Sequence, residues 1–270
     1  MPKTDSVFAG SIPEIYDTLL VPLLFQPYAS DLARRAAERG PADVLETAAG
    51  SGAVTRALAT LLSECARYVV TDLNQPMLDR AAQRQASDKR IVWRQADAAH
   101  LPFEDQSFDV VVCQFGAMFF PDRIACYGET RRVLKPGGRF LFNVWDRIES
   151  NDFARVATEA VSAMFPEDPP RFLARIPHGY HDVETIRSDA QAAGFSPVDI
   201  TTIEAWSDAQ TARDVAIAYC QGTPLRNEIE ARDPAGIEAA TERVAEAIQK
   251  VYGKGAVSGR ICAHIIAAQA

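Results

Sequence analysis

The residues ADVLETAAGSGAVTRALATLL, at positions 42–62, combine an acid with a glycine-rich turn. An apolar run ends at Glu46, small residues follow through Gly50 and Gly52, and apolar residues then recur at helical spacing. Glycines let a ligand come close to the backbone, and the first turn of a helix offers free N–H groups. The pattern therefore predicts a ligand held where a strand passes into a helix.

Further side chains of interest stand where other apolar runs end. Asp72 ends RYVVTD, twenty positions beyond Gly52, where an acid can accept hydrogen bonds from both hydroxyls of a ribose. Asp97 ends RIVWRQAD, and Gln114 and Phe115 end FDVVVCQF. Because the carboxyl ends of parallel strands meet at one edge of a sheet, we expect these residues to line one crevice. Acids buried there without a partner would be costly unless a ligand satisfied them.

Two nucleotide-like ligands fit this arrangement. GSGAVT differs from the dinucleotide motif GxGxxG only in Thr55, which leaves a nicotinamide-dependent oxidoreductase as an alternative. Glu46 lies just before the turn, where it would repel a pyrophosphate but attract an ammonium or a sulfonium. The residues therefore favour S-adenosylmethionine, a nucleoside with a positively charged tail.

The segments that position these residues alternate between two patterns. Short runs rich in Val, Ile and Phe are apolar almost throughout, as in strands covered on both faces. The segments between them repeat apolar residues every three or four positions, as amphipathic helices do. We predict an α/β fold with a doubly wound, Rossmann-like, mostly parallel seven-stranded sheet, helices on both faces and added lid helices. Strands are expected at 42–48, 67–73, 90–97, 108–115, 139–145, 196–206 and 259–267.

Proline and glycine indicate where several helices end. The segment 12–39 reads as helical with interruptions at Pro22 and Pro27, and Pro136-Gly137-Gly138 is expected to stop the helix of 122–134. In terms of domains, we predict an N-terminal helical lid segment at 1–40 and a helical insertion at 207–255 that forms an acceptor lid. The core would comprise 41–206 and 256–270, with an insert at about 146–181.

Composition narrows the classes of partner. The chain has 270 residues and a net charge of −8, so no basic surface is expected for nucleic acid. The early apolar run LLVPLLF is short and broken by proline, and the start MPKTDSVFAG lacks an apolar signal core. Five scattered cysteines without a CxxC pair are typical of reduced thiols, and no metal site is expected. We expect a cytoplasmic protein without a membrane span, a monomer or homodimer, acting on a small molecule.

Four motifs in order resemble the class I S-adenosylmethionine-dependent methyltransferases, in particular their ubiquinone/menaquinone methyltransferase-like small-molecule branch. The motifs are VLETAAGSG, VVTDLNQPMLDRA, ADAAHLPFEDQSFDVVVCQFGAMFFPD and RVLKPGGRFLFNVW, which together cover about residues 40 to 145.

The resemblance implies a role for each matching position. Glu46 would hold the methionine end of the cofactor, Asp72 its ribose and Asp97 the amino group of its adenine. Tyr16, on the leading helix, resembles an aromatic residue that closes over the cofactor in this family. The implied cofactor site comprises Tyr16, Glu46, Ala48, Gly50, Gly52, Asp72, Leu73, Met77, Asp97, Ala98, Gln114 and Phe115.

One position departs from the family pattern. The family usually has glycine where this chain has Ala48. Alanine is compatible with the turn if its φ is negative, because an L residue with a side chain disfavours positive φ. On that condition, we expect cofactor binding to survive with Ala48 in the turn.

The implied reaction is in-line transfer of a methyl group to O, C or N of a small, partly apolar acceptor. It depends mainly on placing the two reactants, so a general base is optional and the catalytic residues stay unknown. The stretch HGYH supplies the candidate bases His178, Tyr180 and His181, in a segment that contributes to the acceptor lid in this family. A binding protein that keeps the nucleoside pocket without turnover is the alternative from another functional class.

Overall fold

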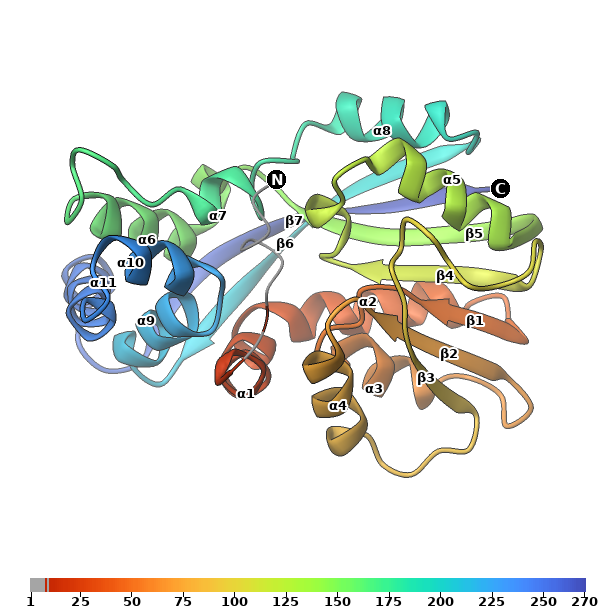
Figure 1. Ribbon diagram of the computed structural model, residues 1–270, viewed down its shortest axis with the longest axis horizontal. Coiled ribbons are helices and arrows are strands. Elements are labelled where there is room, and N and C mark those ends of the chain that lie inside the picture. Colours follow the sequence, from red (N-terminus) through yellow and green to blue (C-terminus); the bar gives the residue numbers. More distant parts are fainter. Residues whose placement is uncertain (1–7, 9) are drawn as a thin grey trace. The chain divides into compact units, whose positions relative to one another are not determined.

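The structure is a computed structural model that describes residues 8 and 10–270 (Figure 1). The segment MPKTDSV, on which the expectation about a signal sequence partly rests, lies outside the described residues. The chain divides into two compact units, which we describe separately. The sheet unit comprises Gln26–Val144, His181–Ile203 and Ala263–Ala270, and the helical unit comprises Met1–Phe25, Trp145–Tyr180 and Glu204–Cys262.

The described residues contain a seven-stranded sheet with the strand order β3-β2-β1-β4-β5-β7-β6. The pairs β1–β2, β1–β4, β2–β3 and β4–β5 are parallel. The doubly wound, mostly parallel sheet expected from the sequence is confirmed. Its strands are β1 (Asp43–Glu46), β2 (Arg67–Asp72), β3 (Ile91–Gln95), β4 (Phe108–Gln114), β5 (Leu134–Trp145), β6 (Val198–Ala209) and β7 (Val257–Gln269).

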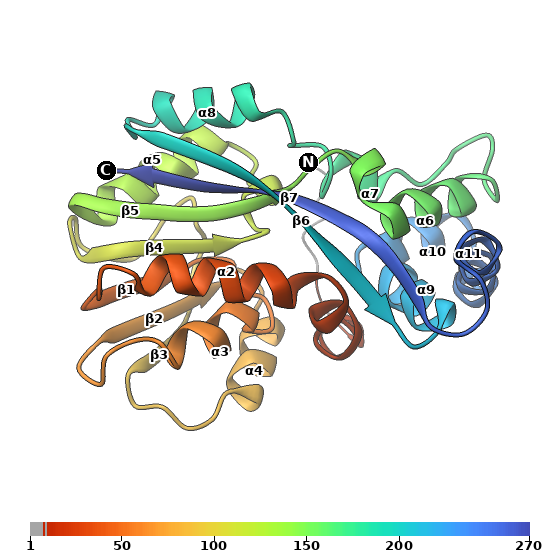
Figure 2. The same ribbon diagram turned by 180° about the vertical axis from the view of Figure 1, so that it is seen from behind.

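Helices cover both faces of the strands in the sheet unit. Figure 2 shows α2 and α3 in front of the sheet, and Figure 1 shows α5 in front of the opposite face. Leu32 on α2 and Leu58 on α3 are fully buried, as is Tyr127 on α5. The elements are α2 (Gln26–Ala37), α3 (Ala53–Ala59), α4 (Gln75–Arg84), α5 (Arg123–Val133), α8 (Val183–Ala192) and the 3₁₀ turn η3 (Ala117–Phe119).

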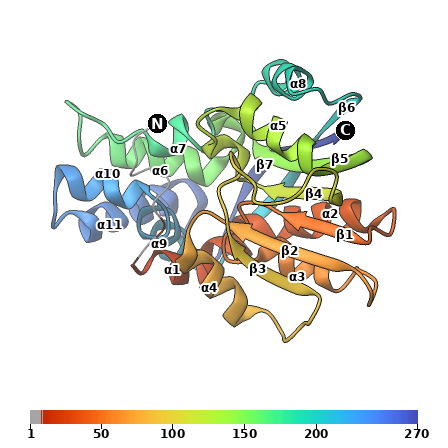
Figure 3. The ribbon, with the colours of Figure 1, turned by 45° about the vertical axis from the view of Figure 1, so that its right-hand side comes forward.

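In the helical unit, α11 packs against α9 and α6 (Figure 3). Val244 and Ile248 of α11 have no exposed surface, as an amphipathic helix facing a core requires. No helix in the described part of the chain has the length and apolarity needed to cross a membrane. The elements are α1 (Ile12–Ile15), the π-helix η2 (Tyr16–Phe25), the 3₁₀ turn η4 (Ile148–Ser150), α6 (Asp152–Ser162), α7 (Phe172–Arg175), α9 (Ala212–Gln221), α10 (Leu225–Arg232) and α11 (Ile237–Tyr252).

Three prolines that were expected to interrupt or stop helices do not do so in the structure. Pro136 does not stop a helix, because α5 already ends at Val133 and Pro136 lies within β5. The register between β4 and β5 shifts there, and such a bulge accommodates a residue that cannot donate to the ladder. Pro22 likewise lies inside η2, whose wider i→i+5 turns avoid the clash with the carbonyl four residues earlier. Pro27 lies in the first turn of α2, where no N–H is needed.

Candidate functional site

The carboxyl ends of β1, β2 and β4 lie side by side in the sheet unit. Glu46 on β1 is paired with Val70 on β2 and with Val112 on β4. Asp72 on β2 is paired in the same parallel manner with Gln95 on β3. The residues at and after these strand ends include Glu46, Ala48, Gly50, Gly52, Asp72, Leu73, Met77, Asp97, Ala98, Gln114 and Phe115, all of the sheet unit.

Glu46 is a buried acid, with 1% of its surface exposed. Its Oε2 accepts hydrogen bonds from the Thr55 hydroxyl, at 2.7 Å, and from the Tyr68 hydroxyl. Burial raises the pKa of Glu46 from 4.5 to about 7; the two hydroxyls and Arg56 oppose this rise, and Asp72 adds to it. Because an ionised carboxylate is costly in such surroundings, a cationic group placed beside Glu46 would remove much of that cost.

Thr55 also bears on the choice between a dinucleotide and a cationic nucleoside. It is the residue in which GSGAVT departs from the dinucleotide motif, and its hydroxyl is held by Glu46. Helix α3 begins directly after Gly52. Gly52 itself has a left-handed backbone conformation, with a φ of 81°. A pyrophosphate at this helix start would meet a carboxylate, so the geometry favours the cationic ligand.

Asp72 is buried but satisfied by the backbone. Its Oδ2 accepts from the N–H of Gly50 at 2.8 Å, and its Oδ1 accepts from the N–H of Asn74 at 2.7 Å. Burial raises the pKa of Asp72, and these two donors act in the opposite direction. The expectation that Asp72 lacks a partner is therefore wrong, because the turns after β1 and β2 supply donors. Oδ1 also accepts from the Asn74 side-chain amide at 3.5 Å, so Oδ2 is the oxygen better placed to accept from a ligand hydroxyl.

Asp97 was also expected to be a buried acid without a partner, and this is wrong as well. Its side chain is exposed, and its Oδ1 accepts from the N–H of Ala99 at 2.9 Å. Solvent can therefore satisfy the rest of the carboxylate. Close to the end of β2, Leu73 is 51% exposed while Met77 on α4 is buried. An exposed leucine at this edge offers apolar surface to a flat ring.

Ala48 does not meet the condition of a negative φ under which alanine was expected to fit the turn. Its φ is 51°, and Phe115 at the end of β4 has a φ of 49°. Both residues occupy the left-handed region, where a side chain costs about 1–2 kcal/mol. The turns containing them also touch, since a Cβ added to Gly116 would lie 2.5 Å from the Cβ of Ala48. The strained backbone is thus fixed by tight packing between the two turns.

Several buried polar atoms at this edge have no hydrogen-bond partner among the described residues. They are the Oγ of Ser51, the Oε1 of Gln114 and the Nδ2 of Asn143. Buried polar groups are normally hydrogen-bonded, so these atoms in the turn after β1, at the end of β4 and within β5 fit a polar ligand. The residues present are therefore compatible with S-adenosylmethionine, which carries both donors and acceptors.

The candidate bases and Tyr16 do not form one group within either unit. His178, Tyr180 and Tyr16 belong to the helical unit, whereas His181 belongs to the sheet unit. His178 is buried, and its Nδ1 lies 2.8 Å from the carbonyl oxygen of Asp146. Because a carbonyl oxygen only accepts, Nδ1 carries the proton and Nε2 is the basic nitrogen of neutral His178. Their roles in acceptor binding and catalysis stay predictions.

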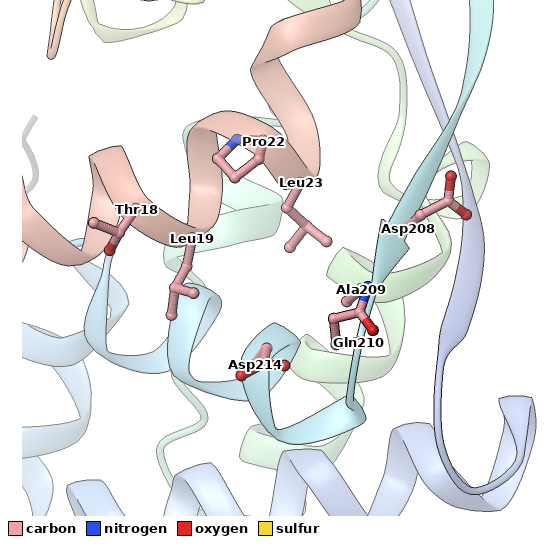
Figure 4. A pocket seen from close by; sticks show the side chains of 8 residues that line it. All are labelled: Thr18, Leu19, Pro22, Leu23, Asp208, Ala209, Gln210 and Asp214. Atoms are coloured by element: carbon pink, nitrogen blue, oxygen red, sulfur yellow. The ribbon is translucent and has the colours of Figure 1, made fainter.

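The helical unit contains a cavity of about 220 Å³ between η2, the end of β6 and α9 (Figure 4). Figure 4 shows apolar side chains of η2 on one side and the carboxylates of Asp208 and Asp214 on the other. Within the described residues, no group of three or more His, Cys, Asp or Glu side chains could hold a metal ion. The cavity is lined by Thr18, Leu19, Pro22, Leu23, Asp208, Ala209, Gln210 and Asp214.

The sequence did not predict a role for four residues near the carboxyl ends of β1, β2, β4 and β5. Tyr68 and Gly116 gave no signal, because an aromatic residue in a strand and a glycine after one are common. Thr55 was noted only as a deviation from a motif. Asn143 could have been found, since it is the one polar residue in the apolar run FLFNVW.

Residues 45–142 match a protein family described as a methyltransferase domain. The ubiquinone/menaquinone biosynthesis C-methyltransferase UbiE of Shewanella frigidimarina is 30% identical over 181 residues, which cover 62% of this chain and 72% of that protein. The demethylmenaquinone methyltransferase of Lactobacillus johnsonii is 30% identical over 171 residues, with 59% and 70% covered. For UbiE of Saccharophagus degradans, 28% identical, the match spans 66% of that protein's length.

Two solved structures share the fold. YcgJ of Bacillus subtilis has a TM-score of 0.58 at 19% identity, covering 90% of this chain and 98% of that one. The phosphoethanolamine N-methyltransferase 2 of Haemonchus contortus, solved with S-adenosyl-L-methionine, has a TM-score of 0.58 at 17% identity. That match covers 96% of this chain and 56% of the Haemonchus chain. At such identities these structures support the fold alone.

Proposed function

The chain belongs to the class I S-adenosylmethionine-dependent methyltransferases, and from this premise we propose that it transfers the methyl group of S-adenosylmethionine to a small, partly apolar acceptor. The observation that supports this most is the pair of buried carboxylates, Glu46 and Asp72, at neighbouring strand ends. The cationic tail of such a ligand suits Glu46, whose ionised form is costly to bury. Its ribose suits Asp72, whose carboxylate is already oriented by two N–H donors.

Under this proposal the protein's own residues bind and orient the reactants. When bound, S-adenosylmethionine supplies an electrophilic methyl group on a sulfonium. Glu46 attracts the positive end of the cofactor, Asp72 accepts from its ribose, and Leu73 packs beside its adenine. The other cofactor residues named from the sequence, Tyr16 and Asp97 among them, keep their expected roles as part of the proposal. Exclusion of water at the buried strand ends favours a reaction in which positive charge is lost.

The acceptor is proposed from two observations. Two of the relatives named above are ubiquinone/menaquinone biosynthesis C-methyltransferases, so a ring compound with apolar parts is a suitable first candidate. Separately, the cavity of the helical unit combines Leu19 and Leu23 with Asp208 and Asp214, a mixture that suits a partly apolar molecule. We further expect a monomer or homodimer that binds no nucleic acid.

Calorimetry with S-adenosylmethionine, S-adenosylhomocysteine and NAD tests the cofactor assignment. We expect micromolar binding of the first two and no heat with NAD. Release of S-adenosylhomocysteine from labelled cofactor, across hydroxylated, amino and quinol acceptors, then tests turnover. Binding without release above background would favour the non-catalytic alternative, and binding of NAD alone would favour an oxidoreductase.

The variant Asp72→Ala should weaken S-adenosylmethionine binding by about 1–3 kcal/mol, the range for losing a charged hydrogen-bond partner. Calorimetry at constant pH measures the effect, and a melting curve shows whether the turn at Gly50 has loosened. Asp79→Ala is the matched control, because Asp79 lies on α4, is exposed and accepts a hydrogen bond from the side chain of Gln75. Equal affinities of the Asp72→Ala variant and the wild type would show that the ribose lies elsewhere.

A further inference from the structure

The cavity of the helical unit has an apolar side and an acidic side. Leu19 and Leu23 of η2 lie on one side, and Asp208 at the end of β6 and Asp214 on α9 lie on the other (Figure 4). The volume is about 220 Å³. Because a cavity of about 150 Å³ can hold benzene, this one has room for a single ring with a short chain.

Asp214 is a half-buried carboxylate in a fixed position. Its Oδ2 accepts hydrogen bonds from the N–H and the hydroxyl of Thr211, at 3.1 and 2.8 Å. In return, the N–H of Asp214 donates to that hydroxyl, which completes a capping box at the start of α9. The Oδ1 of Asp214 has no hydrogen-bond partner among the described residues, so a ligand can bind to an oxygen that is already oriented.

No basic side chain neutralises the acidic side of the cavity. In the part of the chain that the structure describes, neither Asp208 nor Asp214 forms an ion pair. Arg213 directly precedes Asp214, but its guanidinium is bonded to Glu238 and Glu242 on α11. Two carboxylates beside apolar side chains are less well screened than carboxylates in open water, so they favour a positively charged ligand.

An exposed tryptophan lies on the same face of β6 as Asp208. Trp206 is 65% exposed and stands two residues before Asp208, and alternate residues of a strand face the same side about 7 Å apart. Neither of the two cation–π contacts found among the described residues involves Trp206. Since indole attracts an organic cation more strongly than the other aromatic rings do, Trp206 adds to the preference for positive charge.

An organic ammonium ion with an apolar part is the ligand class that matches these features. Its N–H groups can donate to Asp214, and its hydrocarbon part gains from leaving water against Leu19 and Leu23. An anion would be repelled by both carboxylates. A metal ion would gain nothing from the leucines, and the described residues offer no group of three His, Cys, Asp or Glu side chains to hold one.

We propose that the cavity of the helical unit binds an amphipathic amine in its ammonium form, with Asp214 recognising the charge and Leu19 and Leu23 holding the apolar part. As a statement about the methyl acceptor, the inference rests on the proposed function, because it narrows the acceptor to compounds with a basic nitrogen. As a binding site it is independent of that function, and it includes no transfer step.

A pair of probes that differ only in charge provides the test. 2-Phenylethylamine and 2-phenylethanol share a ring and a two-carbon chain, but only the amine is positively charged at neutral pH. Measured by calorimetry without S-adenosylmethionine, the wild type should bind the amine about tenfold more tightly than the alcohol. Salt at about 0.5 M should reduce this preference, since the two carboxylates are not fully buried.

Asp214→Asn removes the charge but keeps an oxygen for the capping contacts with Thr211. It should lose most of the tenfold preference for the amine, while the affinity for the alcohol changes less than about twofold. Asp182→Asn is the matched control, because Asp182 in the sheet unit also accepts from the N–H and the hydroxyl of one threonine, Thr185. Both substitutions alter the start of a helix, but the control should leave both affinities unchanged.

Ala209→Phe locates the site, because its ring would occupy the cavity. This variant should bind both probes at least about tenfold more weakly. The inference is overturned if the wild type binds neither probe or both equally, if Asp214→Asn keeps the preference for the amine, or if Ala209→Phe binds the amine as the wild type does. Since these measurements contain no cofactor, such a result leaves the test of S-adenosylmethionine binding unaffected.

Discussion

Glu46→Gln is expected to stabilise the ligand-free protein at pH 8 while it weakens the binding of S-adenosylmethionine. The pKa of Glu46 lies at about 7 in the folded chain against 4.5 in the unfolded one, because burial penalises the charged form. Such a difference corresponds to about 3 kcal/mol that ionisation costs the folded state. Glutamine has no charge to bury, and its oxygen can still accept from Thr55 and Tyr68.

The sign of the pH dependence follows from the raised pKa. The contribution of Glu46 to stability is fully present below pH 4.5 and is lost as the pH rises through about 7. The variant should therefore match the wild type near pH 4.5 and exceed it by about 1–3 kcal/mol at pH 8. Chemical denaturation at the two pH values measures this difference.

Cofactor affinity should change in the opposite direction. A cationic ligand binds the ionised form of Glu46, so wild-type affinity should fall about tenfold for each pH unit below 7 and level off above it. Glu46→Gln should lose about 3 kcal/mol of affinity at pH 8 and show a flatter profile. Asp72 has a raised pKa from burial too, so part of the acid-side loss should persist in the variant.

Glu129→Gln is a suitable control for both measurements. The partner Arg132 lowers the pKa of Glu129, so this substitution should reduce stability slightly and leave the cofactor affinity as it was. A Glu46→Gln variant that is less stable than the wild type at pH 8, or that binds the cofactor equally well, would show that Glu46 is a structural acid only.

Gly116→Ala is expected to destabilise the protein by about 3 kcal/mol, because there is no room for its methyl group. The new Cβ would lie 2.5 Å from the Cβ of Ala48 and 2.8 Å from the Sγ of Cys113, distances that real Cβ atoms do not adopt. The turns after β1 and β4 would have to separate. Thermal and chemical denaturation of the ligand-free protein measure the loss.

The double variant Ala48→Gly/Gly116→Ala tests the cause. Removing the Ala48 methyl should recover about 2 kcal/mol, the remainder being due to Cys113. Ala48→Gly alone should change stability by less than about 1 kcal/mol, since relief of the positive φ is offset by a more flexible unfolded chain. Gly128→Ala, on α5 with open space around it, should be neutral or stabilising. If the changes in unfolding free energy caused by Ala48→Gly and Gly116→Ala were simply additive, the clash between the two methyl groups would be contradicted.

Periodicity predicted the strands of the sheet because buried parallel strands leave a plain apolar signature. Glu46 and Asp72 could be placed at neighbouring strand ends from that pattern alone, since parallel topology brings such ends together. The predicted ends of helices and strands were less accurate where the preference of a single residue conflicted with the pairing of distant strands. Pro136 signals a helix stop in isolation, yet the bulge between β4 and β5 lets it lie inside a strand.

The remaining features depend on contacts that no local pattern contains. The positive φ of Ala48 results from the turn being held between β2 and the β4 turn, where Ala49 donates to Thr71. Tyr68 reaches Glu46 only because β1 and β2 pair in one particular register. Asn143 likewise accepts from the N–H of Phe115 only once β5 lies beside β4.

The close approach of residues 48 and 116 also limits the order in which this sequence could have evolved. With a methyl group at 48, any side chain at 116 meets the same 2.5 Å obstacle, so glycine is retained there regardless of selection for activity. If a lineage replaced a glycine by Ala48, it thereby required glycine at position 116, sixty-eight residues further along the chain. Ancestral reconstructions of this chain should therefore allow diversity at 116 only on branches that carry glycine at 48.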